Sequence, residues 1–171
     1  MNPKVEYKSE KIHDFLLIRT EAFSDHRGYN YEAYNKEVYN QLFGREIDFL
    51  VDSYAHSTKN VLRGLHGDFT NWKLIEVLHG EVYFVVIDMN PKSSTYKGKE
   101  EVVLTAGNRF QAFLPPGCVN GHCVMSDDAL FHYRLSHGFT PQSDQLSVKW
   151  NDPLFNLIWP TQTPILSKRD Q

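Results

Sequence analysis

Hydrophobic residues recur at every second position in several short stretches of the chain. Side chains of a β-strand alternate between two faces, so this period predicts strands that bury one face. The pattern appears in residues 29–31, 47–51, 60–68, 73–77, 82–87 and 129–135. Turn-forming sequences occupy residues 25–28, 79–80, 106–108, 115–117 and 126–128. Short strands separated by such turns predict an all-β sandwich or barrel.

One helix interrupts this pattern. Asn35 can cap its first turn, Glu37 lies in that turn, and Gly44 can end it. Val38 and Leu42 are spaced as neighbours on one helix face. A short helical turn is also predicted within residues 152–160. No shift in composition marks a boundary, so we predict a single domain over residues 1–171.

Composition narrows the class of protein. The formal net charge of -3 and the pI near 6.2 disfavour non-specific binding to nucleic acid. The longest apolar run, residues 82–87, is too short to span a membrane. Residues 1–15 lack the apolar core of a signal peptide, so a cytoplasmic location is expected. Cys118 and Cys123 are interpreted as small buried hydrophobic residues.

The segment RGLHGDFTNWK, residues 63–73, concentrates groups capable of chemistry. In a regular strand, His66 and Asp68 share one face while Arg63 lies on the other. Gly64 and Gly67 permit a β-bulge that turns Arg63 and His66 toward one cavity. A base and an anion-binding guanidinium would then lie side by side.

Further candidates follow along the chain. Lys73 and Tyr133 lie in register with apolar residues of their strands, while Asn120 and His122 follow the turn at 115–117. Asp170 lies in a polar tail, where a carboxylate is usually solvated. Considered one at a time, such residues are more often structural than catalytic.

The order of several separated motifs changes that view. FSDHRGYNYEAYN at 23–35, RGLH at 63–66, HGEV at 79–82, LPPG at 114–117 and WND at 150–152 occur in turn. This arrangement resembles the nucleotide-diphosphate 4-keto-6-deoxysugar epimerases, of the dTDP-4-dehydrorhamnose 3,5-epimerase type. The resemblance implies a cupin, or jelly-roll, β-barrel with a few short helices. It also implies a homodimer that uses no cofactor and no metal.

The resemblance also implies the role of each group. His66 would be the base, Asp170 its orienting carboxylate, Tyr133 the proton donor and Lys73 the cation beside the enolate. A 4-keto group acidifies the hydrogens on C3 and C5, and a histidine titrating near about 6.5 can remove them at neutral pH. Expected substrate contacts are Arg27, Tyr29, Glu32, Ser53, Arg63, Asp68, Asn120 and His122. The two arginines suit a diphosphate, because a guanidinium matches phosphate oxygens in a bidentate way.

Several positions depart from the usual pattern of the family. Gly67 and Asp68 replace an aromatic residue and a glutamine, and Asn120 replaces a histidine that reappears at His122. RGLHGD, together with Asn120 and His122 after the turn at 115–117, resembles the branch of the family that acts on GDP-linked 4-keto-6-deoxyheptoses in capsule synthesis. The alternative is dTDP-4-dehydrorhamnose epimerisation. Inversion at C3 alone or at both C3 and C5 stays open.

Other functions remain possible on the same barrel. His66, Asp68 and His122 could form a two-histidine, one-carboxylate metal site of a cupin oxygenase. A non-catalytic sugar-nucleotide binding module would have no use for the four catalytic candidates together. A ketoisomerase would use a similar histidine and differ only in its product.

Overall fold

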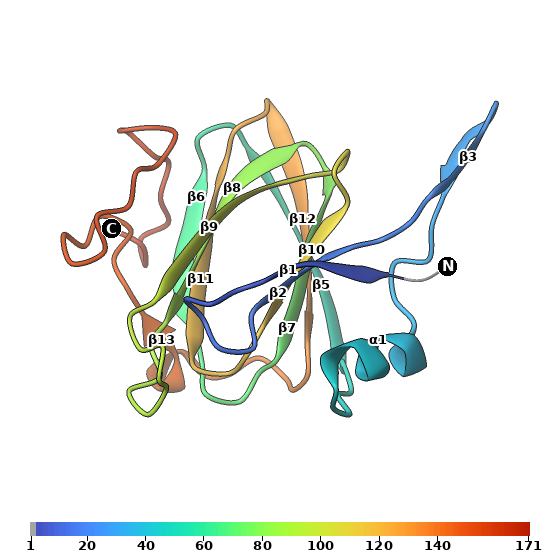
Figure 1. Ribbon diagram of the computed structural model, residues 1–171. Coiled ribbons are helices and arrows are strands. Elements are labelled where there is room, and N and C mark those ends of the chain that lie inside the picture. Colours follow the sequence, from blue (N-terminus) through green and yellow to red (C-terminus); the bar gives the residue numbers. More distant parts are fainter. Residues whose placement is uncertain (1–2) are drawn as a thin grey trace.

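Two antiparallel β-sheets face each other in the computed structural model, which describes residues 3–171 (Figure 1). The six-stranded sheet has the order β1 (Lys4–Lys8), β2 (Leu16–Arg19), β10 (Phe110–Leu114), β7 (Lys73–His79), β12 (Asp128–Leu135) and β5 (Val51–Thr58). The five-stranded sheet has the order β13 (Leu146–Ser147), β6 (Leu62–Gly67), β11 (Cys118–Val124), β8 (Glu81–Asp88) and β9 (Lys99–Thr105). This is the all-β jelly-roll architecture that the sequence predicts.

Two small elements lie outside these sheets. Strands β3 (Phe23–Asp25) and β4 (Gly28–Asn30) form a hairpin that projects from the barrel as an arm (Figure 1). A 3₁₀ turn, η1 (Gln142–Asp144), precedes β13. No helix among residues 3–171 has the length and apolar character needed to cross a membrane.

The predicted helix is confirmed as α1 (Lys36–Phe43). The Asn35 side chain accepts a hydrogen bond from the Val38 amide at 3.4 Å. Gly44 ends the helix with φ of 67°, a left-handed conformation that favours glycine. The buried face carries Tyr39 and Phe43, which pack on the outer side of the six-stranded sheet.

Apolar side chains fill three layers. The space between the sheets holds one cluster, centred on residues such as Val82, Phe84 and Phe131. A second cluster lies under α1, and a third lies between the five-stranded sheet and the C-terminal segment that covers it. Because the C-terminal segment covers the outer face of the five-stranded sheet, β8 is apolar on both sides.

Three local predictions need correction. Residues 45–50 are irregular and the strand starts only at Val51; Ile47 and Phe49 are apolar because they pack in the cluster under α1. Strand β4 covers Gly28–Asn30, so the predicted 29–31 strand is shifted by one residue and Tyr31 lies outside it. Residues 152–160 contain hydrogen-bonded turns but no helix. Both cysteines are free and buried, as predicted.

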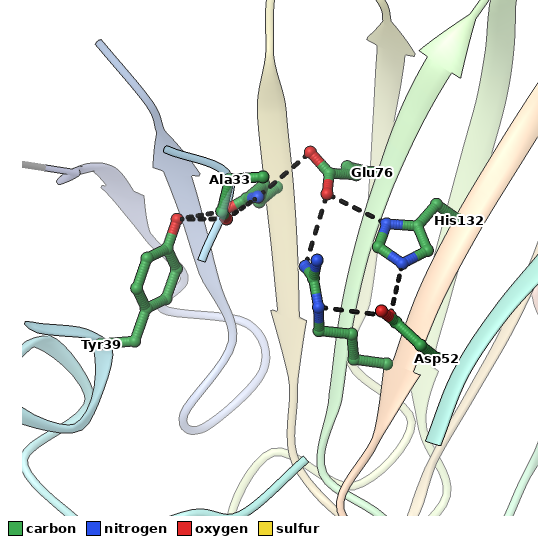
Figure 2. A network of polar contacts seen from close by, with 7 residues as sticks. Ala33, Tyr39, Asp52, Glu76 and His132 are labelled. Carbon is green, nitrogen blue, oxygen red and sulfur yellow. Dashed lines mark hydrogen bonds and ion pairs between the residues drawn. The ribbon is translucent and has the colours of Figure 1, made fainter. Parts of the chain in front are cut away.

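A polar network lies on the outer face of the six-stranded sheet (Figure 2). His132, whose side chain is 2% exposed, contacts Asp52 through Nε2 at 2.6 Å and Glu76 through Nδ1 at 3.0 Å. Arg134 lies within 3.4 Å of both carboxylates. Gln111 donates to Glu76 at 3.1 Å. One buried carboxylate thus joins three neighbouring strands, β7, β12 and β10.

Replacing Glu76 by alanine should destabilise the fold strongly. The substitution leaves His132, Arg134 and Gln111 without their shared acceptor in a buried position. Loss of one partner from a buried ion pair costs about 3–5 kcal/mol in the free energy of unfolding. Urea denaturation of Glu76→Ala and of wild type under the same conditions measures this change in the free energy of unfolding.

Glu6→Ala is the matched control, because Glu6 pairs with Lys4 at the surface. An exposed pair contributes about 1 kcal/mol or less. Equal loss of stability in the two variants would contradict a structural role for the network.

Candidate active site

A cavity of about 270 Å³ lies between the two sheets. Its wall includes most of the residues predicted to be functional, although they are far apart in the sequence. Those on the wall are Arg63, His66, Asp68, Lys73, Asn120, His122 and Tyr133. The antiparallel pairing of β6 with β11, and of β7 with β12, brings these side chains together.

The predicted β-bulge in β6 is confirmed. His66 pairs with Asn120 and Arg63 pairs with His122, so three steps along β6 match two along β11. The extra residue turns both Arg63 and His66 toward the cavity, which strict alternation would prevent. Gly64 allows this, because its φ is 112° and an added Cβ would lie 2.6 Å from the carbonyl oxygen of Asn120.

His66 contacts a carboxylate from the far end of the chain. Its Nε2 lies 2.6 Å from Oδ1 of Asp170, and the two side chains are 27% and 5% exposed. Ser167 donates a hydrogen bond to the other carboxylate oxygen at 2.9 Å. The second ring nitrogen, Nδ1, lies 3.2 Å from the hydroxyl of Ser147. Position in the sequence suggested a solvated Asp170; the fold buries it instead.

The C-terminal segment reaches His66 because it is bound along β6. The amide of Leu62 donates to the carbonyl of Ile165, and the amide of Ile165 donates to the carbonyl of Asn60. Trp159 packs against the outer face of the sheet, and its indole N–H donates to the carbonyl of Trp150 at 2.7 Å. These contacts fix the direction of the tail before it turns to place Asp170.

Burial is the main cause that lowers the pKa of His66. The positive charge of Arg169 lowers it further, and Lys73 contributes in the same direction. Asp170 opposes them through its charge and its hydrogen bond. Because the net pKa of His66 lies below its usual value, the imidazole is neutral and able to accept a proton at neutral pH.

Lys73 extends into the same cavity from β7. Its ammonium donates to Oδ1 of Asn120 at 2.9 Å and to the carbonyl of His66 at 3.3 Å. Burial lowers its pKa, partly opposed by the charge of Asp68. An ammonium has three N–H donors, so one remains to point at a ligand oxygen.

Tyr133 lines the cavity from β12. It pairs with Ile75 of β7 and Ser53 of β5, and its ring meets Phe139 edge to face at 6.4 Å. The hydroxyl forms no hydrogen bond with any residue in the range 3–171. It is therefore available to a ligand.

Comparison with known proteins gives a consistent result. The family model described as dTDP-4-dehydrorhamnose 3,5-epimerase matches residues 9–171. The Shigella flexneri protein of that name is 36% identical over 163 residues, covering 94% of this chain and 90% of its own. The chain belongs to the dTDP-4-dehydrorhamnose 3,5-epimerase family.

Solved structures agree with this assignment. The Bacillus anthracis enzyme with TDP and pyrophosphate bound has a TM-score of 0.92 at 31% identity, covering 98% of this chain and 96% of its own. The Legionella pneumophila enzyme in complex with dTDP-4-keto-L-rhamnose has the same score and identity, covering 99% and 90%. The chain is thus an isomerase of the nucleotide-sugar epimerase class, as its motifs indicate.

The resemblance to this epimerase family also predicted contacts that lie away from the cavity. Arg27 and Tyr29 lie in the β3–β4 hairpin and Glu32 follows it, and none of the three lines the cavity of its own chain. Arg27 is bound to Asp25, with Nη2 2.6 Å from Oδ2. Ser53 pairs with Tyr133 on the neighbouring strand but is not part of the cavity wall.

Asp68 lines the cavity, but its carboxylate is already engaged. It accepts hydrogen bonds from the amides of Thr70 and Asn71 and from both of their side chains. Burial raises the pKa of Asp68, and these hydrogen bonds more than reverse that effect, so its net pKa is lowered. The carboxylate holds the loop after β6 in place.

Two residues of the site were missed in the sequence. Arg169 lines the cavity, donates to Oε1 of Gln145 at 2.6 Å, and influences the titration of His66. Its position beside Asp170 in LSKRD was the available signal. No sequence signal pointed to Ser147, because only the pairing of β13 with β6 brings it next to His66.

The metal-site alternative finds no support in the side-chain positions. Within residues 3–171, no group of three or more His, Cys, Asp or Glu side chains is placed to hold an ion. His66 is directed at Asp170, and Asp68 at its own loop. His66, Asp68 and His122 are therefore not arranged as the metal site of that alternative.

Asp170→Asn should change both the rate and the pH dependence. The substitution removes both effects by which Asp170 raises the pKa of His66, so the acid limb of the kcat/KM profile should move to lower pH. The rate should fall about 100-fold or more, because the imidazolium loses its stabilising carboxylate. Initial rates across the pH range measure both.

Asp144→Asn, in the exposed turn η1, is the control and should match wild type. If the acid limb of the kcat/KM profile moved to higher pH in Asp170→Asn, the claim that Asp170 raises the pKa of His66 would be wrong.

Proposed function

We propose that the chain inverts C3, C5 or both in a nucleotide-diphosphate-linked 4-keto-6-deoxy sugar. The observation that carries this proposal is the 2.6 Å contact between His66 and Asp170 at a cavity that also contains Lys73 and Tyr133. Removal and return of a proton beside a carbonyl need a base, an oxyanion cation and an acid. The cavity offers one group for each.

His66 acts as the base. A carboxylate accepts hydrogen bonds, so Asp170 favours the tautomer with the proton on Nε2. Nδ1 then carries the free lone pair that takes hydrogen from the carbon, after its contact with Ser147 gives way to substrate. Asp170 stabilises the imidazolium that forms.

Lys73 and Tyr133 complete the reaction. The carbanion delocalises into the C4 carbonyl as an enolate, whose oxygen receives the remaining N–H of Lys73 in a water-poor cavity. Tyr133 is a neutral acid with an unused hydroxyl, and it returns a proton to the face opposite the one that His66 deprotonated. Proton return from the opposite face inverts the carbon.

The diphosphate is held by guanidinium groups. Arg63 and Arg169 both line the cavity and suit phosphate oxygens. Arg27 reaches a cavity only if the projecting arm inserts into a second copy of the chain. A homodimer is therefore part of the proposal.

The dTDP-linked substrates named for the relatives have more support than the GDP-linked heptose that the motifs favoured. One departure from the family pattern also has a simpler cause. A Cβ on Gly67 would lie 2.0 Å from the carbonyl oxygen of Cys118, so close packing of β6 on β11 requires the glycine. Extra room for a heptose is not needed to explain it. The GDP-linked heptose and a role in capsule synthesis are the second candidate.

Deuterium exchange tests the assigned roles. Wild type in deuterium oxide should incorporate deuterium at C3, C5 or both of dTDP-4-keto-6-deoxyglucose. His66→Asn should abolish this exchange, since no base remains. Tyr133→Phe should retain exchange but lose inversion, because the proton returns only to its original face. NMR of the sugar resolves both. Wild-type exchange in His66→Asn would refute the base assignment.

The nucleotide and sugar are tested in parallel. Matched kcat/KM values with dTDP-linked hexose and GDP-linked heptose substrates should favour the dTDP compound by about tenfold or more, as expected for a pocket that hydrogen-bonds a particular base. A preference for the GDP-linked heptose would reverse the proposed substrate and leave the chemistry unchanged.

A further inference from the structure

His122 is a buried imidazole with no assigned partner at one end of the cavity. The residue is 4% exposed, and its Nε2 is buried without a hydrogen bond to any described residue. The ring stacks on Phe131, with centroids 3.9 Å apart and planes 14° from parallel. Both rings line the cavity.

Packing alone does not explain a histidine at this position. A phenylalanine would keep the stack on Phe131 and leave no polar atom unsatisfied, whereas a buried nitrogen without a partner destabilises the protein. Burial, with the nearby charge of Arg63, lowers the pKa of His122 to about 3. The ring is therefore neutral, with one N–H donor and one lone pair to offer a ligand.

The register indicates which part of the substrate lies there. His122 pairs with Arg63, and the adjacent pair of the same two strands is Asn120 with His66. Arg63 is the proposed diphosphate contact and His66 the proposed base. In the sugar, C1 carries the diphosphate and C3 loses a proton, so C2 lies between the two contacts. A sugar held by these two contacts would have its C2 hydroxyl nearest the wall between Arg63 and His66.

We infer that His122 hydrogen-bonds the C2 hydroxyl of the sugar and selects substrates that carry it. This inference rests on the proposed function, since it uses the positions of the diphosphate and the base. His122 moves no proton in the reaction. It contributes to binding by satisfying its own nitrogen only when the correct sugar is present.

The test compares two variants on two substrates, dTDP-4-keto-6-deoxyglucose and its 2-deoxy analogue. His122→Phe should lower kcat/KM about tenfold or more with the hydroxylated sugar, the size expected for a buried hydrogen bond, and less than about twofold with the analogue. His122→Gln keeps a donor and an acceptor and should retain part of the activity. His79→Phe, on the exposed end of β7, is the control and should match wild type on both sugars.

Thermal unfolding separates binding from a structural role. Without ligand, His122→Phe should melt at the same temperature as wild type or higher, because an unsatisfied polar atom has been removed. If His122→Phe lost kcat/KM equally on both sugars, the inference would be overturned. A melting temperature of His122→Phe low enough to explain the loss of activity would also overturn it. If His122→Phe does not fold, the same comparison with His122→Leu decides.

The outcomes also distinguish this inference from the proposed function. Absence of wild-type deuterium exchange with either sugar would refute the epimerase proposal itself. Normal exchange in wild type, without any dependence of the His122→Phe effect on the C2 hydroxyl, would refute only the role of His122.

Discussion

The molecule depends on the regular alternation of side chains in the paired parts of two strands, residues 131–135 of β12 and 73–77 of β7. On β12, Tyr133 points into the cavity while His132 and Arg134 on either side point into the outer network. On β7, Lys73 faces the cavity and Glu76 faces outward. If the pairing of these strands shifted by one residue, the two faces would be exchanged. The charged groups of the network would then point into the cavity, and Tyr133 would point out of it. The outer network therefore stabilises the register that the site requires.

Features governed by local rules could be predicted from the sequence. The caps at Asn35 and Gly44 define α1, and the glycines around His66 define the bulge, because each depends on the conformation of a few neighbouring residues. Period-two patterns located β4, β6, β7, β8 and β12. The exception, residues 45–50, has alternating apolar residues that pack beneath a helix instead of pairing in a sheet. An alternating pattern indicates that one side of a segment is buried. An irregular segment can bury one side as well as a strand can, so the pattern does not fix the backbone conformation.

The remaining features depend on contacts between distant segments. Nothing near Asp170 in the sequence indicates that it lies against His66, 104 residues away; only the resemblance to a family indicated it. Ser147 and the Glu76 network likewise arise from strand pairing. The resemblance also placed Arg27 in the site, whereas in its own chain this residue lies on an arm outside the barrel. A family pattern gives a residue's role without stating which copy of the chain supplies it.

The wall formed by β6 and β11 has little freedom to vary. At Gly64 and Gly67, an added methyl group would collide with the main chain of β11 at 2.6 and 2.0 Å. A side chain at either position would therefore force β6 away from β11 in this chain. Substrate preference in this chain should thus be set by the side chains that project into the cavity, from β11 at Asn120 and His122 and from the facing strands β5 and β12.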